Sequence, residues 1–128
     1  MRFVLMILLA IVSSGAAAQL ILAGQSIEHD YYFDSATIQK SGNLVKMWEV
    51  YDYKAAQEVG DAFTYRSDRT LREYDCSNEQ TRRLSVKVYS ENMGNGALLV
   101  GYDDPSQWTH NQPASGVEHL WKIVCGKT

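Results

Sequence analysis

The sequence predicts an α+β protein: a single antiparallel sheet of about six strands, packed by one C-terminal helix and tied to that helix by a disulfide. Three observations predict this architecture. Short segments that alternate apolar and polar residues recur along the chain between turn signals. One stretch near the C-terminus is amphipathic and carries helix-capping residues at both ends. The chain also holds two cysteines, Cys76 and Cys125.

The first 18 residues predict a secretory signal peptide. An apolar run follows Arg2, and Ala16-Ala17-Ala18 then forms a cleavage site before Gln19. The run is about ten residues long, whereas a helix that spans a membrane needs about 20. We therefore expect a signal peptide at 1–18, one mature domain at 19–128 and no transmembrane segment in the mature chain.

The charge balance of the mature chain is acidic. The full chain has 12 Lys and Arg against 15 Asp and Glu, and cleavage would remove one of the basic residues, Arg2. A surface that binds nucleic acid must neutralise phosphates with basic residues. The composition therefore argues against a nucleic-acid partner.

The two cysteines indicate a structural disulfide. An exported protein enters an oxidising compartment, and two cysteines allow one intramolecular pairing, Cys76–Cys125. A metal site would need further Cys or His ligands at short spacing, and a redox pair is normally C-x-x-C. Neither pattern surrounds these cysteines, so the disulfide is the favoured interpretation.

The predicted strands follow one another with turns between them. The segment 43–53 alternates Lys46 and Trp48 with Met47 and Glu49 after the turn signal Ser41-Gly42-Asn43. Further short segments are rich in residues that favour strands. The predicted strands are 29–34, 36–40, 43–53, 62–68, 70–76, 83–90 and 96–102.

The C-terminal stretch predicts a helix of about ten residues. Ser115 and Glu118 form a capping box, and Gly126 stands where a C-terminal cap is expected. An apolar stripe at helical spacing includes Trp121 and Cys125. Because a single sheet needs a second layer to bury its apolar face, this helix is expected to cover it.

Several segments together resemble one bacterial family. They are "YYFDSATIQKSGNLVKMWEVYDYK", "YRSDRTLREYDCSNEQTRRL", "YSENMGNGALL", "QWTHNQPAS" and "LWKIVCGK", in order over residues 29 to 127. In these segments the chain resembles the bacterial surface-adhesin E (protein E-like) family. The resemblance implies an antiparallel sheet tied to a C-terminal helix by the two cysteines. It also implies a non-enzymatic role: binding host extracellular-matrix or plasma proteins such as vitronectin, laminin and plasminogen.

One feature of the family's founding member is absent from this sequence. That protein is lipid-anchored, whereas no cysteine lies near the predicted cleavage site here. We therefore expect an exported protein without a lipoprotein anchor, either periplasmic or secreted, with the cell surface as a further location. The alternative function is a periplasmic, envelope-associated structural or interaction protein, including a homodimer formed through a free sheet edge.

The candidate partner-binding residues lie around the first cysteine. All five arginines of the mature chain fall between positions 66 and 83, with Tyr74 among them and Tyr65 directly before them. Arginine and tyrosine are enriched where proteins bind one another. The window also holds four carboxylates, so a solvated, salt-bridged face is the competing interpretation. The candidates are Tyr65, Arg66, Arg69, Arg72, Tyr74, Arg82 and Arg83.

The sequence favours neither catalysis nor a cofactor. None of the three histidines belongs to an H-E-x-x-H motif, and no G-x-S-x-G elbow or Gly-rich phosphate loop occurs. We therefore expect no catalytic residues, no metal and no cofactor.

Overall fold

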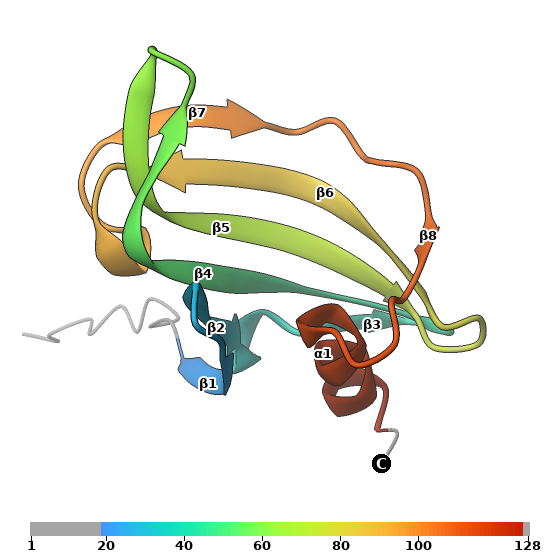
Figure 1. Ribbon diagram of the computed structural model, residues 1–128. Helices are drawn as coiled ribbons and strands as arrows, with labels where there is room; N and C mark the ends of the chain where they lie inside the picture. The colour runs from blue at the N-terminus through green and yellow to red at the C-terminus, as the bar shows by residue number, and fades with distance from the viewer. Residues whose placement is uncertain (1–18, 127–128) are drawn as a thin grey trace, which may run out of the picture.

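The computed structural model describes residues 19–126, so the predicted signal peptide at 1–18 lies outside the described residues. Figure 1 shows a broad, twisted sheet with one helix packed below it. The elements in chain order are β1 (Leu20–Gln25), β2 (His29–Asp34), η1 (Ser35–Thr37), β3 (Gln39–Ser41), β4 (Leu44–Val59), β5 (Phe63–Asp75), β6 (Gln80–Tyr89), η2 (Asn92–Gly94), β7 (Leu98–Tyr102), β8 (Thr109–His110) and α1 (Gly116–Cys125).

The sheet contains eight strands, so the prediction of about six was wrong. Its main path runs β1-β2-β4-β5-β6-β7, while β3 pairs with β4 and β8 pairs with β6. Every pairing in the described sheet is antiparallel. The additional strands β3 and β8 have three and two residues, which is too short for alternation to be recognised in a sequence.

Three other differences concern which strands occur and where they begin and end. Strand β1 was not predicted, because its sequence LILAGQ is a nearly continuous apolar run that follows the predicted cleavage site. The predicted strands 62–68 and 70–76 form the single strand β5. The predicted strand 36–40 is divided between η1 and β3.

Helix α1 has the predicted caps and buries the predicted stripe. The Ser115 hydroxyl accepts a hydrogen bond from the Glu118 amide at 3.1 Å, and Gly126 adopts the left-handed conformation that ends the helix, with φ of 66°. The helix packs on one face of the sheet, here called the helix face. The buried core between them consists of Phe33, Val45, Met47, Tyr74, Leu120, Trp121 and Val124.

The predicted disulfide is confirmed. Cys76 and Cys125 are bonded across a sequence separation of 49, and their Cα atoms lie 5.5 Å apart. A second link joins the same elements, because the Trp121 indole donates a hydrogen bond to the carbonyl of Asp75 at 2.8 Å. The end of β5 is therefore held to α1 both covalently and by a buried hydrogen bond.

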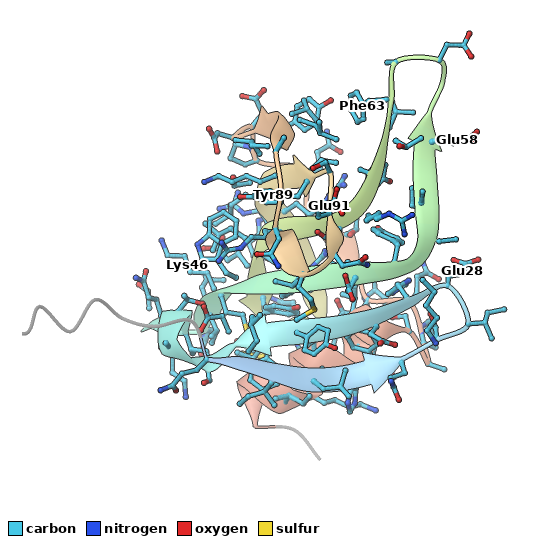
Figure 2. The ribbon with its side chains drawn as sticks, turned by 90° about the vertical axis from the view of Figure 1, so that its left-hand side faces the viewer. Glu28, Lys46, Glu58, Phe63, Tyr89 and Glu91 are labelled. Atoms are coloured by element: carbon cyan, nitrogen blue, oxygen red, sulfur yellow. A yellow bond between two sulfur atoms is a disulfide. The ribbon has the colours of Figure 1, made fainter. Side chains whose placement is uncertain are left out.

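The β4–β5 hairpin is longer than the rest of the sheet. Its regular pairing shifts between Asp52 and Gln57, and the distal part extends away from the other strands (Figure 1, green). Residues 58–62 at its tip are all exposed. Glu58 and Phe63 mark the two sides of this arm in Figure 2.

Candidate partner-binding surface

The seven predicted partner-binding residues do not share one surface. Side chains alternate between the two faces of a strand, so on β5 Arg72 points to the helix face and Arg69 to the opposite face, here called the outer face. On β6, Arg82 pairs with Glu73 of the outer face, and Arg83 pairs with Arg72 of the helix face. The structure therefore divides the arginine-rich window between two sides of the sheet.

Two of the seven residues belong to a buried polar network on the helix face. The Glu49 carboxylate is fully buried and accepts a hydrogen bond from Arg72 Nε at 3.1 Å. The hydroxyl of Tyr51 donates to the same oxygen at 3.0 Å, and the hydroxyl of Tyr74 donates to the other oxygen. Three donors, from Arg72, Tyr51 and Tyr74, thus converge on one buried carboxylate, so Arg72 and Tyr74 organise the interior.

Burial controls the protonation of this network. Desolvation raises the pKa of Glu49 above its ordinary value, although the Arg72 charge and the three hydrogen bonds oppose that rise. Burial is the largest influence on the pKa of Arg72 and lowers it, but the Glu49 charge, its hydrogen bond and the neighbouring Tyr51 and Tyr74 together raise that pKa. Desolvation, reinforced by Glu49, also raises the pKa of Tyr51 and Tyr74.

Three more of the predicted residues lie at the margins of the sheet. Tyr65 packs edge-on against Tyr53 at the base of the hairpin arm, with ring centroids 5.6 Å apart. Arg66 is exposed on the arm, and Arg83 is exposed at the rim of a hollow in the helix face. The hollow has a volume of about 290 Å³ and is lined by His29, Tyr51, Tyr53, Asp68, Thr70, Arg72, Arg83, Val86 and Val117.

The aromatic side of this hollow is densely packed. The His29 ring lies 5.5–6.1 Å, centroid to centroid, from the rings of Tyr31, Tyr51 and Tyr53. Tyr53 donates a hydrogen bond to Asp68 at 2.9 Å. Desolvation raises the pKa of Asp68, while that hydrogen bond acts in the opposite direction. This cluster forms a rigid wall beside the Glu49 network.

The remaining two arginines lie on the outer face, where Arg69 joins two residues that the sequence analysis did not select. Arg69 of β5 pairs directly with Lys87 of β6. Both cations lie over the Trp48 ring of β4, at 5.8 Å for Arg69 and 5.4 Å for Lys87. The three side chains line a shallow depression of about 210 Å³.

A second pairing of a cation with an indole lies farther along the same face. Arg82 forms an ion pair with Glu73 at 2.7 Å and lies over the Trp108 ring at 4.8 Å. Lys46 pairs with Glu73 across β4 and β5, so it also belongs to the outer face. Lys46 is labelled in Figure 2. We call Lys46, Trp48, Arg69, Lys87, Arg82 and Trp108 the outer-face cluster.

The outer-face cluster has an excess of positive charge. Within residues 19–126, no carboxylate lies within 4 Å of the charged groups of Lys46, Arg69 or Lys87. The Arg69 Nε atom is also buried without a hydrogen-bond partner in that part of the chain. Two cations directly opposite each other across a strand pair repel. The arrangement therefore favours a negatively charged partner.

The sequence analysis did not select four members of the outer-face cluster: Lys46, Trp48, Lys87 and Trp108. The alternation over 43–53 places Lys46 and Trp48 on one side, and a positive residue on each neighbouring strand was visible in the sequence. The register that brings Arg69 against Lys87 was not visible, because strand pairing depends on contacts far apart in the chain.

Residues 19–126 contain neither of two further features, a metal site and a membrane-spanning helix. No cluster of three or more His, Cys, Asp or Glu side chains in that range has the arrangement needed to hold a metal ion. No helix there is both long enough and apolar enough to cross a membrane.

The fold and the disulfide define a class of small α+β domains in which one helix is bonded to the face of an antiparallel sheet. The model of the family described as surface-adhesin protein E matches residues 20–126. The chain belongs to the surface-adhesin protein E family, as the sequence resemblance predicted. No curated protein matches the chain.

Solved structures of Haemophilus influenzae protein E share the fold. Crystal form II of that protein has a TM-score of 0.62 and 18% identity, over 87% of this chain and 97% of that chain. A structure of protein E from non-typeable Haemophilus influenzae has a TM-score of 0.60 and 18% identity, over 88% of this chain and 79% of that chain. At this identity the similarity shows the fold.

Proposed function

We propose that this protein is an exported, non-enzymatic binding protein that attaches to host extracellular-matrix or plasma proteins of the vitronectin, laminin or plasminogen type. Membership of the surface-adhesin protein E family supports this role. The observation that carries the proposal is the outer-face cluster, in which Arg69 and Lys87 converge on Trp48 without a carboxylate within 4 Å among the described residues. Tryptophan and arginine are the side chains most enriched among residues that dominate binding energy.

The structure narrows the set of residues that can contact a partner. Arg69 and Arg82 belong to the outer-face cluster, and Arg66 is exposed on the hairpin arm. Tyr74 is fully buried and hydrogen-bonded to Glu49, and Arg72 is paired with the same carboxylate and reaches the surface only at the hollow in the helix face. Tyr65 and Arg83 stay as candidates at the margins.

Export is the second part of the proposal. A signal peptide at 1–18 would deliver the mature domain 19–128 to the periplasm, the medium or the cell surface, without a lipoprotein anchor. The Cys76–Cys125 disulfide supports this route, because disulfides persist in oxidising compartments and are rare in the bacterial cytosol.

A periplasmic, envelope-associated interaction protein is the second candidate function. The edge strand β1 favours it, because Ile21 and Leu22 are 46% and 47% exposed and their backbone has a free side. An exposed apolar edge strand is a surface on which a second strand can pair. A homodimer formed through β1 would use this edge and leave the outer-face cluster unoccupied.

Two measurements test the proposed function. The first digests intact cells with an external protease and follows the mature chain by immunoblot. Its loss from intact cells supports surface display, whereas survival until osmotic shock supports the periplasmic alternative. The second measures binding of the purified protein to immobilised vitronectin, laminin and plasminogen. Absence of binding to all three would contradict the adhesin role.

The binding assay needs variants that leave the interior intact. Replacing Arg66, Arg69 and Arg72 together would confuse binding with folding, because Arg72 is paired with buried Glu49. The double variant Arg66→Ser/Arg69→Ser removes the two accessible members of that set. Weaker binding with unchanged thermal unfolding would support the proposal.

A further inference from the structure

We propose that the outer-face cluster binds a linear sulfated polysaccharide, with sulfate groups between Arg69 and Lys87. This inference rests on the proposed function, because both place the partner on the outer face. It adds the chemical class of the ligand: a chain of anionic sugars.

The first support is the electrostatics of the Arg69–Lys87 pair. Direct cross-strand pairing holds the two cations close together, and neither has a carboxylate within 4 Å in residues 19–126. The carboxylates of this face are already engaged. In its middle, Asp103 accepts a hydrogen bond from the Ser85 hydroxyl at 2.7 Å and Glu73 is paired with Arg82. Asp52 accepts hydrogen bonds from Asn92 and the Met93 amide, and Asp75 accepts from the Ser77 amide, Asn78 and Gln80. An anion between the two cations would remove their repulsion.

The second support is the way in which the side chains are held. Both cations lie over the Trp48 ring, and Arg69 also lies against Gly94, where an added Cβ would be only 3.0 Å from its Cδ atom. Side chains fixed in this way lose little conformational freedom when a ligand binds. Arginine presents a planar set of donors that matches an oxyanion, and lysine adds a point charge.

The third support is the length of the cluster. Arg69 and Glu73 are four residues apart on β5, which corresponds to about 13 Å along an extended strand. Glu73 holds Arg82, which lies over Trp108, and Lys46 pairs across from Glu73. A single small anion would occupy only the Arg69–Lys87 end, whereas a linear polyanion would contact both ends.

The cluster is a poor match for nucleic acid. Binding to single-stranded nucleic acid relies on bases stacking on open aromatic rings. Two cations already lie over the Trp48 ring and one lies over the Trp108 ring. The whole chain also has a net charge of −3, which is unfavourable for binding a duplex through its phosphates.

The test measures binding of a heparin octasaccharide to the wild-type protein and to two double variants of equal charge. Arg69→Gln/Lys87→Gln removes two positive charges from the cluster. Lys54→Gln/Lys122→Gln removes two exposed lysines outside it. We expect at least a ten-fold loss of affinity in the first variant and less than a two-fold change in the second. Equal losses in both variants would overturn the proposal.

Two further arms identify the ligand and the site. A fully desulfated octasaccharide and a single-stranded DNA of equal charge should both bind at least ten-fold more weakly than the sulfated chain. Equal or tighter binding of either would overturn the proposal. In an NMR titration, the Trp48 indole signal, assigned with Trp48→Phe, should shift while that of buried Trp121 does not. A disaccharide should bind more weakly than the octasaccharide, and equal affinities would contradict contact with both ends.

The outcome is separable from that of the proposed function. If the protein does not bind the octasaccharide but binds matrix proteins, the sulfated-polysaccharide inference fails and the adhesin proposal stands. If it binds the octasaccharide through the cluster but none of the three host proteins, the adhesin proposal fails and the inference stands.

Discussion

Glu49 and Arg72 form an ion pair in the interior of the sheet, at 3.1 Å, with the Glu49 side chain fully buried and the Arg72 side chain 13% exposed. The hydroxyls of Tyr51 and Tyr74 complete the hydrogen bonding of the carboxylate. A buried pair that is fully hydrogen-bonded fixes the arrangement of its neighbours. Removing one partner leaves the other charge uncompensated.

We predict that Glu49→Gln lowers the free energy of unfolding by about 3–5 kcal/mol, because Arg72 then lacks a counter-charge in the interior. Urea denaturation followed by circular dichroism measures the change. The matched control is the double variant Glu49→Gln/Arg72→Gln, which removes both charges, keeps an acceptor oxygen for the Tyr51 and Tyr74 hydroxyls and should recover most of the loss. A double variant as unstable as the single one would contradict a balanced pair.

We predict that Cys76→Ser and Cys125→Ser each lower stability by about 4 kcal/mol, because the disulfide restricts the unfolded chain over a separation of 49 residues. Thermal unfolding in non-reducing buffer measures the effect. The double variant should lose no more than either single variant, since one bond is removed in each case. An unchanged melting temperature in the single variants would contradict a stabilising disulfide.

The lowered pKa of Asp75 predicts how the stability of the protein changes in acid. The hydrogen bond from Asn78, with those from Gln80 and the Ser77 amide, holds the pKa of Asp75 below its ordinary value of 3.8. A carboxyl group whose pKa is lower in the folded state stabilises the fold above the unfolded pKa, and this contribution is lost as pH falls through the folded pKa. Asp75→Asn should therefore be less stable at neutral pH and should lose less stability than the wild type below about pH 4.

Comparing the wild type with the Asp75→Asn variant separates the effect of Asp75 on acid stability from the effects of other titratable groups. Burial raises the pKa of Glu49 and Asp68, and these groups have the opposite effect, since protonation favours their folded state. Both groups are present in the wild type and in the variant, so their contributions cancel when the two unfolding free energies are subtracted. Parallel curves of unfolding free energy against pH would contradict the assignment to Asp75.

We predict that Gly24→Ala destabilises the protein by about 1–3 kcal/mol through overpacking. A Cβ atom at position 24 would lie 2.6 Å from Tyr31 Cε1, and closer still to the ring carbon and hydroxyl beyond it. To make room, the Tyr31 ring would have to give up its stacking on Tyr51 and its contact with the His119 ring. Gly101→Ala is the control, since its Cβ would meet only the Val86 carbonyl oxygen at 3.9 Å. Equal stability of the two variants would contradict the close packing.

Local signals predicted the helix, and the presence of two cysteines in an exported chain predicted the disulfide, whereas long-range register decided the binding surface. Ser115, Glu118 and Gly126 act within one turn of their own positions, so their roles were visible in the sequence. The arginine window appeared to be one patch, although Arg69 and Arg72 are an odd number of residues apart on a strand and must face opposite sides. A register shift between Leu71 and Arg72 leaves Leu84 unpaired on β6, and this bulge determines the side of Arg83.

The hairpin arm of β4 and β5 offers a place to add sequence. Its tip contains Gly60, with φ of 51°, and every residue from 58 to 62 is exposed. Insertions are best tolerated at exposed tips whose backbone makes few contacts with the rest of the domain. An epitope tag or a fluorophore inserted there would lie away from the core and the disulfide. A labelled protein of this kind could be followed in living cells without altering the residues whose binding is in question.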